Sequence, residues 1–317
     1  MPLPRTFQFS ATSLQDYVDC HRRFQLRYLL QIAWPAPEAE PIGERERHGR
    51  LARDFHRLAH QHLLGLPPDI LAASVHDPDL LRWWQAYLAY RETLTNGQVI
   101  PEVGLSVPLA GHRLLAQYDA LVVSDTLLAG EPERQAGVPE SGPSFLILDL
   151  KTYRKRPPAA WLRGRLQSRV YPFVLVQAGA SLVSQHPSED FHPGVAPGAV
   201  QMCYWLAEFP QDPEFFAYDE AAYQSDWSYL ASLVAEIADR SSGTTWSEPG
   251  MHFASVEAWP LTTDLRLCRF CNYRPLCERG DVAGPFAEYL AHEEDRVIDE
   301  IGLDVDLDWG QVQEIVY

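Results

Sequence analysis

Three cysteines lie close together near the C-terminal end of the chain, in the segment LCRFCNYRPLCERG. Cys268 and Cys271 form a C-x-x-C pair, and Cys277 follows after five further residues. Thiolates at such spacing bind soft metal ions or iron–sulfur clusters. Nothing nearby supplies a fourth ligand in comparable spacing, so the segment predicts a site that is completed from elsewhere in the chain.

A second set of reactive side chains lies in two apolar stretches. Asp119 ends the run LLAQYD, and Asp149 lies in FLILDLK with Lys151 two residues later. Residues i and i+2 of a strand project to the same face, so we expect Asp149 and Lys151 to share one wall of a pocket. An aspartate in an apolar strand is costly unless it is paired or binds a metal ion, so both aspartates require a partner.

These groups suit the hydrolysis of a phosphodiester bond. Two neighbouring carboxylates are the oxygen ligands that a hard cation such as Mg²⁺ or Mn²⁺ takes. Lys151 is then placed to orient the attacking water or help deprotonate it. The alternative is a plain salt bridge between Asp149 and Lys151 at the end of a strand, which is the commoner interpretation of an isolated D-x-K.

Composition limits the class of protein. The chain has 317 residues and 46% hydrophobic content, enough to bury a sizeable core in one large domain or two small ones. No apolar run approaches the ~20 residues that cross a bilayer, and MPLPRTFQFSATS lacks the features of a signal peptide. We therefore expect a cytoplasmic protein without a membrane partner. In a reducing compartment, five clustered cysteines favour metal or cluster binding over disulfides.

Charge is unevenly distributed along the chain. The formal net charge of −17 opposes general binding to polyanions. Residues 281–317 contain eleven acidic residues and one arginine, whereas residues 151–169 contain basic residues and no acidic one. The second segment predicts a basic strip for the backbone of a nucleic acid, formed by Arg154, Lys155, Arg156, Arg163, Arg165 and Arg169.

Apolar periodicity predicts the elements that position these groups. Helices are expected at 13–31, about 44–64, about 78–95, about 160–180 and about 219–240. Strands are expected at 102–109, 112–123, 144–153 and 199–209, with a polar loop at 129–143. The central order of helix, three strands, helix and strand predicts an α/β sheet flanked by helices.

The domain organisation follows from this order. We expect one domain over residues 1–280, followed by an acidic tail at 281–317. Within the domain, N-terminal helices at about 13–95 precede a core at about 100–240, and a cysteine-rich segment at 264–280 closes it.

The motifs, in the order in which they occur along the chain, resemble those of the PD-(D/E)XK nuclease superfamily. Within it they resemble the RecB-like branch that carries an iron–sulfur cluster, as in AddB-type recombination subunits and CRISPR adaptation nucleases. The YD at 118–119 is similar to the first metal-binding motif, the DLK at 149–151 to the D-x-K, and the QSRVY at 167–171 to a Q-x-x-x-Y. The segment GRLARDFHRL resembles a glycine-led helix with a metal-binding histidine, which points to His56. The resemblance covers most of residues 10–280.

This resemblance implies a restriction-endonuclease-like core with extra helices. The ligands it implies for Mg²⁺ or Mn²⁺ are His56, Asp119, Asp149 and the backbone carbonyl of Leu150. Lys151 would position the water and offset charge on the phosphoryl oxygens. Gln167 and Tyr171 would fix Lys151 or a DNA phosphate.

The resemblance also implies where the fourth cysteine lies. In the iron–sulfur branch it precedes a basic and aromatic helix near the N-terminus, which points to Cys20 in YVDCHRRFQLRYLL. Four thiolates suit a [4Fe–4S] cluster, which would act as a staple between the first helix and the C-terminal segment. A structural zinc ion is the alternative, although such sites usually pair two short motifs. Cys203 is expected to be a small buried hydrophobe.

Taken one at a time, some residues of these motifs also have simpler interpretations. His48 and His60 lie in the same helical region as His56, and His60 lies one turn beyond it on the same face. A lone histidine is more often a satisfied surface or core residue than a ligand. Gln167 and Tyr171, four residues apart, also fit an ordinary core-facing helix surface.

We expect a metal-dependent DNA nuclease acting on single strands or ends, in DNA repair, recombination or defence. The second hypothesis is a DNA-binding or scaffold subunit that works only beside a helicase or another partner. Any helicase motor must be a separate chain, because this one lacks the phosphate-binding motif G-x-x-x-x-G-K-[ST]. A third hypothesis, a thiol-based redox protein, would leave the Asp, Lys, Gln and Tyr pattern unused.

Overall fold

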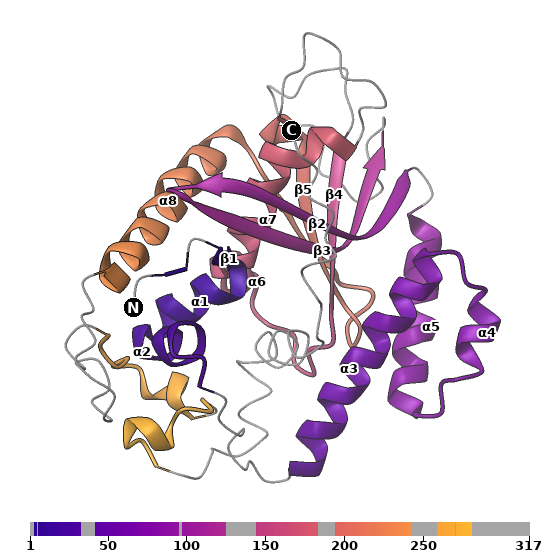
Figure 1. The fold of residues 1–317 in the computed structure, drawn as a ribbon. Helices are drawn as coiled ribbons and strands as arrows, with labels where there is room; N and C mark the ends of the chain where they lie inside the picture. The colour runs from indigo at the N-terminus through magenta and orange to yellow at the C-terminus, as the bar shows by residue number, and fades with distance from the viewer. Residues whose placement is uncertain are drawn as a thin grey trace.

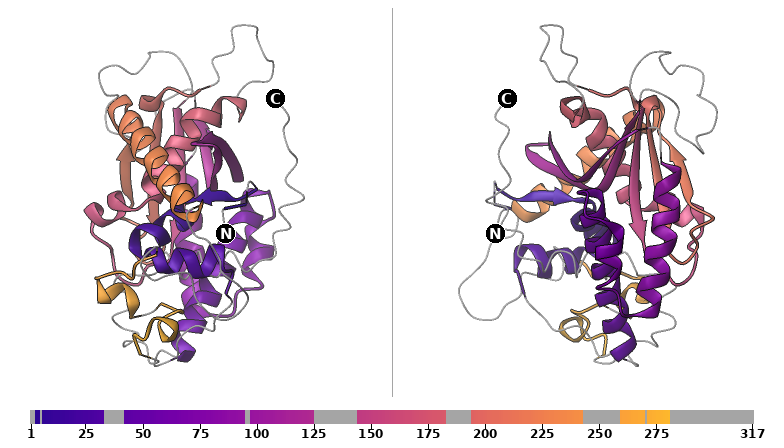
Figure 2. Two further views of the ribbon diagram at one scale, coloured as in Figure 1. Left: turned by 60° about the vertical axis from the view of Figure 1, so that its left-hand side comes forward. Right: turned by 90° about the vertical axis from the view of Figure 1, so that its right-hand side faces the viewer.

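The computed structural model describes residues 3–4, 6–32, 42–94, 97–124, 144–182, 194–242, 259–269 and 271–280. A mixed sheet of six strands forms its centre, with helices on both sides (Figures 1 and 2). The α/β class is therefore confirmed. The expected polar loop at 129–143 and the acidic tail at 281–317 lie outside the described residues.

The sheet is organised around β3 (His112–Ser124). Strand β2 (Gln98–Leu109) pairs antiparallel along one edge of β3. Strands β1 (Gln8–Ser10) and β4 (Ser144–Lys151) therefore share the other edge, β1 near the start of β3 and β4 near its end. Asp119 lies on β3 between these two partners.

The remaining strands extend the sheet beyond β4. Strand β5 (Val200–Leu206) runs parallel to β4, and β6 (Glu214–Ala217) runs antiparallel to β5. All residues of β4 and β5 are buried. Their nearly continuous apolar sequences suit central strands that are covered on both faces.

Two apolar cores cover the two faces of the sheet. One contains side chains of α1 (Ala11–Asp19), α7 (Gln167–Ala178) and α8 (Glu220–Ser242). The other contains side chains of α3 (Ile42–Leu63), α4 (Pro68–Ala72) and α5 (Pro78–Thr93). The shorter helical segments are α2 (His21–Phe24), a π-helix at Gln25–Leu29, α6 (Ala159–Gly164), and 3-10 turns at Gly179–Leu182, Pro197–Ala199, Leu265–Cys268 and Pro275–Cys277.

The side-chain alternation of β3 shifts in the middle of the strand. Tyr118 and Leu121 pack in the core of α7 and α8, whereas Ala120 packs in the core of α3 and α5. Regular alternation would put residues 118 and 120 on one face. The shift falls at Asp119, and Glu102 on the neighbouring strand has a φ of +43° there. As a result, Asp119, which contacts His56 of α3, and Ala120 both face the side of α3.

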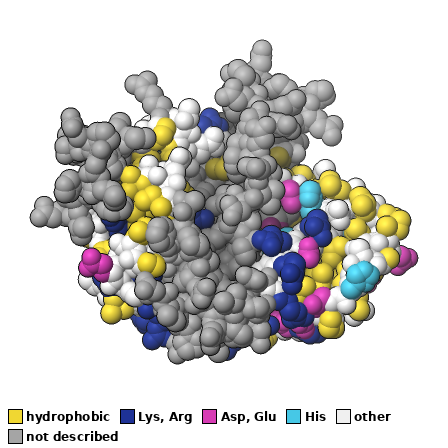
Figure 3. Space-filling model, turned by 60° about the horizontal axis from the view of Figure 1, so that its bottom comes forward, with side chains coloured by type: hydrophobic (Ala, Val, Ile, Leu, Met, Phe, Trp, Pro, Cys, Tyr) yellow, Lys and Arg dark blue, Asp and Glu magenta, His cyan; other side chains and the backbone are white. Residues whose placement is uncertain are grey.

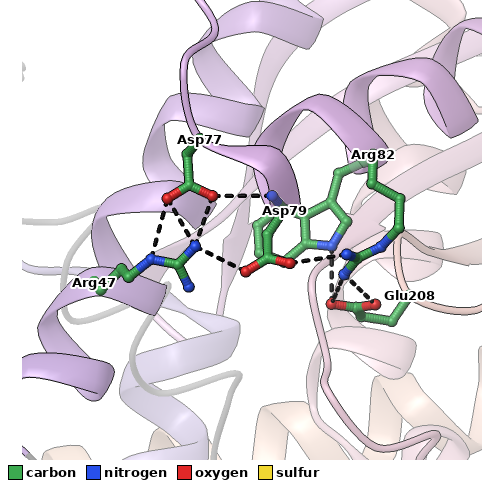
Figure 4. Close-up of polar contacts among 6 residues, drawn as sticks. Arg47, Asp77, Asp79, Arg82 and Glu208 are labelled. Atoms are coloured by element: carbon green, nitrogen blue, oxygen red, sulfur yellow. Dashed lines mark hydrogen bonds and ion pairs between the residues drawn. The ribbon is translucent and has the colours of Figure 1, made fainter.

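Helix α3 is fixed to the rest of the molecule by apolar and charged contacts. Phe55 is fully buried and stacks on Trp205 of β5 with ring centroids 6.0 Å apart. On the surface, ion pairs of 2.7 to 2.8 Å join α3 to α5 and then α5 to the turn after β5 (Figure 4). The ion-paired residues are Arg47, Asp77, Asp79, Arg82 and Glu208.

Two expected helices are each broken. The helix expected at 13–31 is interrupted at Cys20, whose backbone is extended with φ −163° and ψ 110°. Buried ion pairs of 2.8 and 2.9 Å from Arg23 to Asp16 and Asp19 hold α2 against α1 across this break. The helix expected at 160–180 is interrupted at Arg165, where ψ is 145°.

The other expected elements are present, with ends shifted by a few residues. Strands β1 and β6 and the short helix α4 were not expected, because three to five residues carry too little periodicity to be recognised. None of the helices that the structure describes combines the length and apolar content needed to cross a membrane.

Candidate active site

Asp119 and Asp149 lie on neighbouring strands near the point where β3 and β4 separate. The ladder between these strands ends at the pair Ala120 and Leu148. Beyond it, the backbone N–H of Leu150 donates a hydrogen bond to Oδ2 of Asp119 at 2.7 Å. A carboxylate thus takes the position of a strand carbonyl in the gap between the two strands.

The carbonyl of Leu150 faces the same gap. The carbonyl of Lys151 accepts a hydrogen bond from the N–H of Ala207, on the side of β5. Because the backbone groups of successive residues in a strand point to opposite edges, the carbonyl of Leu150 points toward β3. The carbonyl oxygen of Leu150, one of the expected metal ligands, therefore lies on the same side of β4 as Asp119.

Helix α3 brings His56 to Asp119. The distance from Nδ1 of His56 to Oδ1 of Asp119 is 3.3 Å. Burial lowers the pKa of His56, but attraction and hydrogen bonding to the Asp119 carboxylate outweigh burial, so the pKa is raised. Burial raises the pKa of Asp119, and His56 and the Leu150 N–H outweigh this effect, so that pKa is lowered. Each group thus keeps its partner charged over a wider pH range.

Asp149 and Lys151 form a buried pair on the other side of the gap. Nζ of Lys151 lies 3.0 Å from Oδ2 of Asp149, and each residue is 3% exposed. Gln167, at the first turn of α7, donates from Nε2 to Oδ1 of Asp149 at 2.8 Å. The ring of Tyr204 lies 5.8 Å from Nζ of Lys151. The two side chains share a face as expected, and the salt bridge of the simpler interpretation is present.

The two members of the Q-x-x-x-Y pattern have different contacts. Gln167 holds Asp149, the acidic partner of Lys151. Tyr171 lies one turn later, and its backbone carbonyl accepts a hydrogen bond from the hydroxyl of Tyr118 at 2.9 Å. The rings of Tyr118 and Tyr171 are 5.1 Å apart in an edge-to-face arrangement. Both residues therefore tie α7 to the strands that carry the aspartates.

The other histidines of α3 have partners elsewhere. Nδ1 of His60 lies 3.2 Å from Oε1 of Glu102. His48 is buried with its ring against Trp83, and burial lowers its pKa to about 4. Of these histidines, His56 is the one that contacts Asp119. Glu102 was not expected at the site, because its position across from Asp119 follows only from the register of β2 and β3.

The donor groups suit a hard divalent cation, because carboxylate and carbonyl oxygens are its preferred ligands. Asp119, His56 and the Leu150 carbonyl face one gap, whereas the oxygens of Asp149 contact Lys151 and Gln167. Among the described residues, no three His, Cys, Asp or Glu side chains are arranged closely enough to hold a metal ion. The expected ligands are thus neighbours that have not converged on one point.

The expected basic strip has many partners within the protein. Arg156 forms ion pairs with Asp212 at 2.7 Å and Glu214 at 2.9 Å. Arg169 lies 3.5 Å from Asp226. Arg163 and Arg165 lie over the rings of Phe216 and Trp161, Lys155 is exposed and Arg154 half-buried. These contacts leave less of the charge of the strip for a phosphate backbone.

The four expected cysteines line one pocket. Cys20 lies at the break between α1 and α2, and Cys268, Cys271 and Cys277 belong to the C-terminal turns beside it (Figure 1). All four are half-buried free thiols. Burial, followed by the neighbouring Cys20, raises the pKa of Cys277 to about 11. The pocket is also lined by Arg23, Arg274 and Arg279.

Cys203 lies apart from this pocket, on β5. It is fully buried, and its Sγ lies 3.5 Å from the hydroxyl of Tyr90. Burial raises the pKa of its thiol to about 12. The residue therefore occupies the core position that was expected.

One signal in the sequence was not used. The chain contains 26 lysines and arginines, of which only Lys151 and Lys155 are lysines. One of the two is buried beside Asp149, although lysine is rarely buried unless paired. In a sequence that otherwise uses arginine, this choice of side chain singles out position 151 independently of any motif.

A protein-family model and two solved structures are similar to this chain. The family model of the PD-(D/E)XK nuclease superfamily matches residues 8–278. No curated protein matches the chain. Among solved structures, SSO0001 is similar with 10% identity and a TM-score of 0.36, covering 85% of this chain and 85% of that one. A “Putative exonuclease” from Eubacterium rectale has 6% identity and a TM-score of 0.40, covering 78% and 91% respectively.

Proposed function

The chain belongs to the PD-(D/E)XK nuclease superfamily, and from this premise we propose that it is a metal-dependent DNA nuclease that hydrolyses phosphodiester bonds. The observation that carries the proposal is that Asp119 accepts a hydrogen bond from the N–H of Leu150, the residue between the buried ion pair of Asp149 and Lys151, so that the three charged residues are neighbours where β3 and β4 separate. Taking two ionic side chains out of water costs several kcal/mol per ion before their attraction is counted. A buried pair beside a second carboxylate fits a reaction centre better than a structural contact.

Each residue of the candidate active site has its own proposed role. His56, Asp119, Asp149 and the carbonyl of Leu150 would hold Mg²⁺ or Mn²⁺, which superfamily nucleases generally use and which supplies Lewis acidity toward the phosphate. Lys151 orients the attacking water and offsets negative charge on the phosphoryl oxygens in the transition state. Gln167 keeps the Asp149 carboxylate in place.

The test is cleavage of end-labelled DNA, single-stranded and double-stranded, with Mn²⁺ or Mg²⁺. Arg113→Ala is the control for Lys151→Ala, because it removes a basic side chain that is exposed and lies outside the basic strip. We expect metal-dependent cleavage by the wild type and by Arg113→Ala, and at least about a 100-fold loss in Lys151→Ala. Circular dichroism must first establish that Lys151→Ala is folded, because Asp149 loses its partner. Equal cleavage by the two variants would contradict the assigned site.

The cysteine pocket has its own proposal, which concerns the RecB-like branch. We propose that Cys20, Cys268, Cys271 and Cys277 bind a [4Fe–4S] cluster that fastens the C-terminal segment to the first helices. Support comes from the presence of all four thiols in one pocket, although 248 positions separate Cys20 from Cys268. Arginines in the pocket wall offset the negative charge of four thiolates. A structural zinc ion is the alternative.

The metal content of protein purified without oxygen distinguishes these alternatives. A cluster gives about four iron and four sulfide per chain with a brown colour, whereas the alternative gives one zinc. Cys277→Ser should lose the bound metal, and Cys203→Ala, which changes the cysteine outside the pocket, should keep it. Equal metal content in both variants would exclude the pocket as the binding site.

A second candidate function is a DNA-binding or scaffold subunit that needs a helicase or another partner. The ion pairs of Arg156 and Arg169 favour it, because they reduce the positive charge with which a chain of net charge −17 attracts DNA. Wild-type protein that contains its metal but cleaves no DNA alone, and becomes active when a helicase is added, would support this function.

A further inference from the structure

The exposed face of α3 carries three arginines that no role has yet explained. Arg50, Arg53 and Arg57 are exposed. Arg57 pairs with Asp54 at 2.8 Å and its side chain is still 65% exposed. Arg50 and Arg53 have no ion pair or side-chain hydrogen bond with any residue that the structure describes. Figure 3 shows basic side chains gathered over this helical part of the molecule, with acidic and histidine side chains among them.

This face adjoins the candidate active site. Residues three apart on a helix are surface neighbours, so Arg53 lies beside His56. His56 in turn lies 3.3 Å from Asp119. Arg57 directly follows His56 in the sequence and lies one turn beyond Arg53. The arginines therefore lie along α3 beside His56, the residue that contacts Asp119.

The arginines on this face have fewer acidic partners than those of the basic strip at 151–169. In the strip, Arg156 contacts two acidic residues and Arg169 contacts a third. On α3, Asp54 is the one acidic residue that the structure pairs with Arg50, Arg53 or Arg57 among the described residues. An arginine without an acidic partner keeps its full attraction for an anion, and its planar guanidinium suits a phosphate group.

We propose that Arg50, Arg53 and Arg57, the α3 arginine face, bind the phosphate backbone of the nucleic-acid strand and lead it to the site at Asp119. This inference rests on the proposed nuclease function. A helix rises 1.5 Å per residue, so the face is about 10 Å long. Along the axis of duplex DNA each strand carries one phosphate per about 3.4 Å, so this length corresponds to about three phosphates of one strand. A local basic surface also explains how an acidic protein attracts a polyanion.

The test measures binding separately from cleavage. In a Lys151→Ala background, the anisotropy of a fluorescein-labelled 20-nucleotide DNA strand is titrated at several salt concentrations. The variant is Arg50→Gln with Arg53→Gln and Arg57→Gln. The control is Arg113→Gln, an exposed arginine six residues before Asp119 on β3, or about 20 Å away along the strand.

We expect the triple variant to bind at least about 10-fold more weakly, with the slope of log affinity against log salt reduced by about 2 to 3. The control should bind like its background protein. Glutamine is nearly neutral on an exposed helix surface, and an unchanged circular dichroism spectrum establishes that α3 is intact. Binding by the triple variant within twofold of its background, with the same slope, overturns the inference.

The same titration separates this inference from the proposed function. If the background protein binds DNA and the triple variant binds equally well, the α3 arginine face is excluded while the nuclease assignment stands. If the background protein binds no DNA strand, both fail together. The titration is repeated with an RNA strand of the same sequence. If the α3 arginine face binds the phosphates, which DNA and RNA have in common, the triple variant binds both strands more weakly.

Discussion

The candidate active site and the cysteine pocket both join distant parts of the chain, but they are held in different ways. At the active site, Asp119 and Asp149 lie on neighbouring strands of a buried sheet, and each contacts a charged or polar partner. In the pocket, the half-buried thiols extend from a helix break at Cys20, from two 3-10 turns at Cys268 and Cys277, and from irregular backbone at Cys271. The segment at 259–280 is tied to the N-terminal part through Trp259 against Phe24 and through the Tyr273 hydroxyl on the Ile32 carbonyl.

This difference separates a site whose side chains are held by protein contacts from one that needs its ligand. The charged groups of the active site are already paired, so the site keeps its shape by protein contacts alone. The thiols in the pocket are half-buried, and burial raises the pKa values of Cys268 and Cys277. A bound metal centre would add contacts between the segments that carry these thiols, because binding energy at such a site is folding energy.

The largest effect should follow from breaking the pocket. We expect Cys277→Ser to lose about 5 kcal/mol or more of stability, which lowers the midpoint of thermal unfolding by roughly 10 °C or more. Limited proteolysis should then cut within 259–280. Cys203→Ala, the matched control, should remain resistant there. If both variants unfold at the wild-type temperature, the pocket contributes nothing to holding the chain together.

The next effect should be on activity and leave stability nearly unchanged. Asp119→Asn removes a carboxylate charge, but its amide oxygen can still accept the Leu150 N–H. We expect cleavage to fall by about 100-fold to 1000-fold, while the free energy of unfolding changes by about 1 kcal/mol or less. Asp212→Asn, at an exposed partner of Arg156, should cleave normally. A variant as active as the wild type would remove Asp119 from the site.

A smaller effect tests whether the active site is held by protein contacts. Gln167→Met removes the donor to Asp149 with little change in size. A hydrogen bond to a charged group contributes about 1.5 to 3 kcal/mol, and we expect that loss in urea denaturation. Gln224→Met removes an exposed contact with Glu220 and should cost about 0.5 kcal/mol or less. Equal costs would mean that the Gln167 contact does not hold the site.

The smallest effect concerns pH in metal-free buffer. Because the folded pKa of His56 is raised, its pair with Asp119 stabilises the fold fully below the ordinary histidine pKa and loses this effect as pH rises through the folded value. At the acid end, the effect is lost as pH falls through the lowered pKa of Asp119. We expect His56→Ala to have a lower free energy of unfolding than the wild type. This difference should be larger at pH 6 than at pH 9, by up to about 1 kcal/mol. An exposed-histidine variant, His76→Ala, should show no such trend, and a pH-independent difference for His56→Ala would contradict the pairing.

The sequence contained enough information for the α/β class, the main helices and strands, and the shared face of Asp149 and Lys151, because these depend on local periodicity. It did not reveal the break at Cys20, which depends on buried ion pairs between α1 and α2. The break at Arg165 was missed for a similar reason, since the side chain of Gln15 accepts the N–H of Leu166 there.

Contacts between distant elements were also beyond sequence patterns. The ion pairs of Arg156 and Arg169 come from β6, the turn before it and α8, so a run of basic residues overstated the available charge. The pairing of His60 with Glu102 depends on the register of β2. The roles of the individual site residues stay predictions that the variants above can test.

The most direct test of the division between the two sites is the binding of Mn²⁺, measured by the electron paramagnetic resonance signal of the free ion. Wild-type and Cys277→Ser proteins are compared with Asp119→Asn, each checked for folding. We predict that the first two bind the ion with similar affinity and that Asp119→Asn binds at least about 10-fold more weakly. Binding that survives in Asp119→Asn and is lost in Cys277→Ser would contradict the assignment of the divalent cation to the carboxylate site.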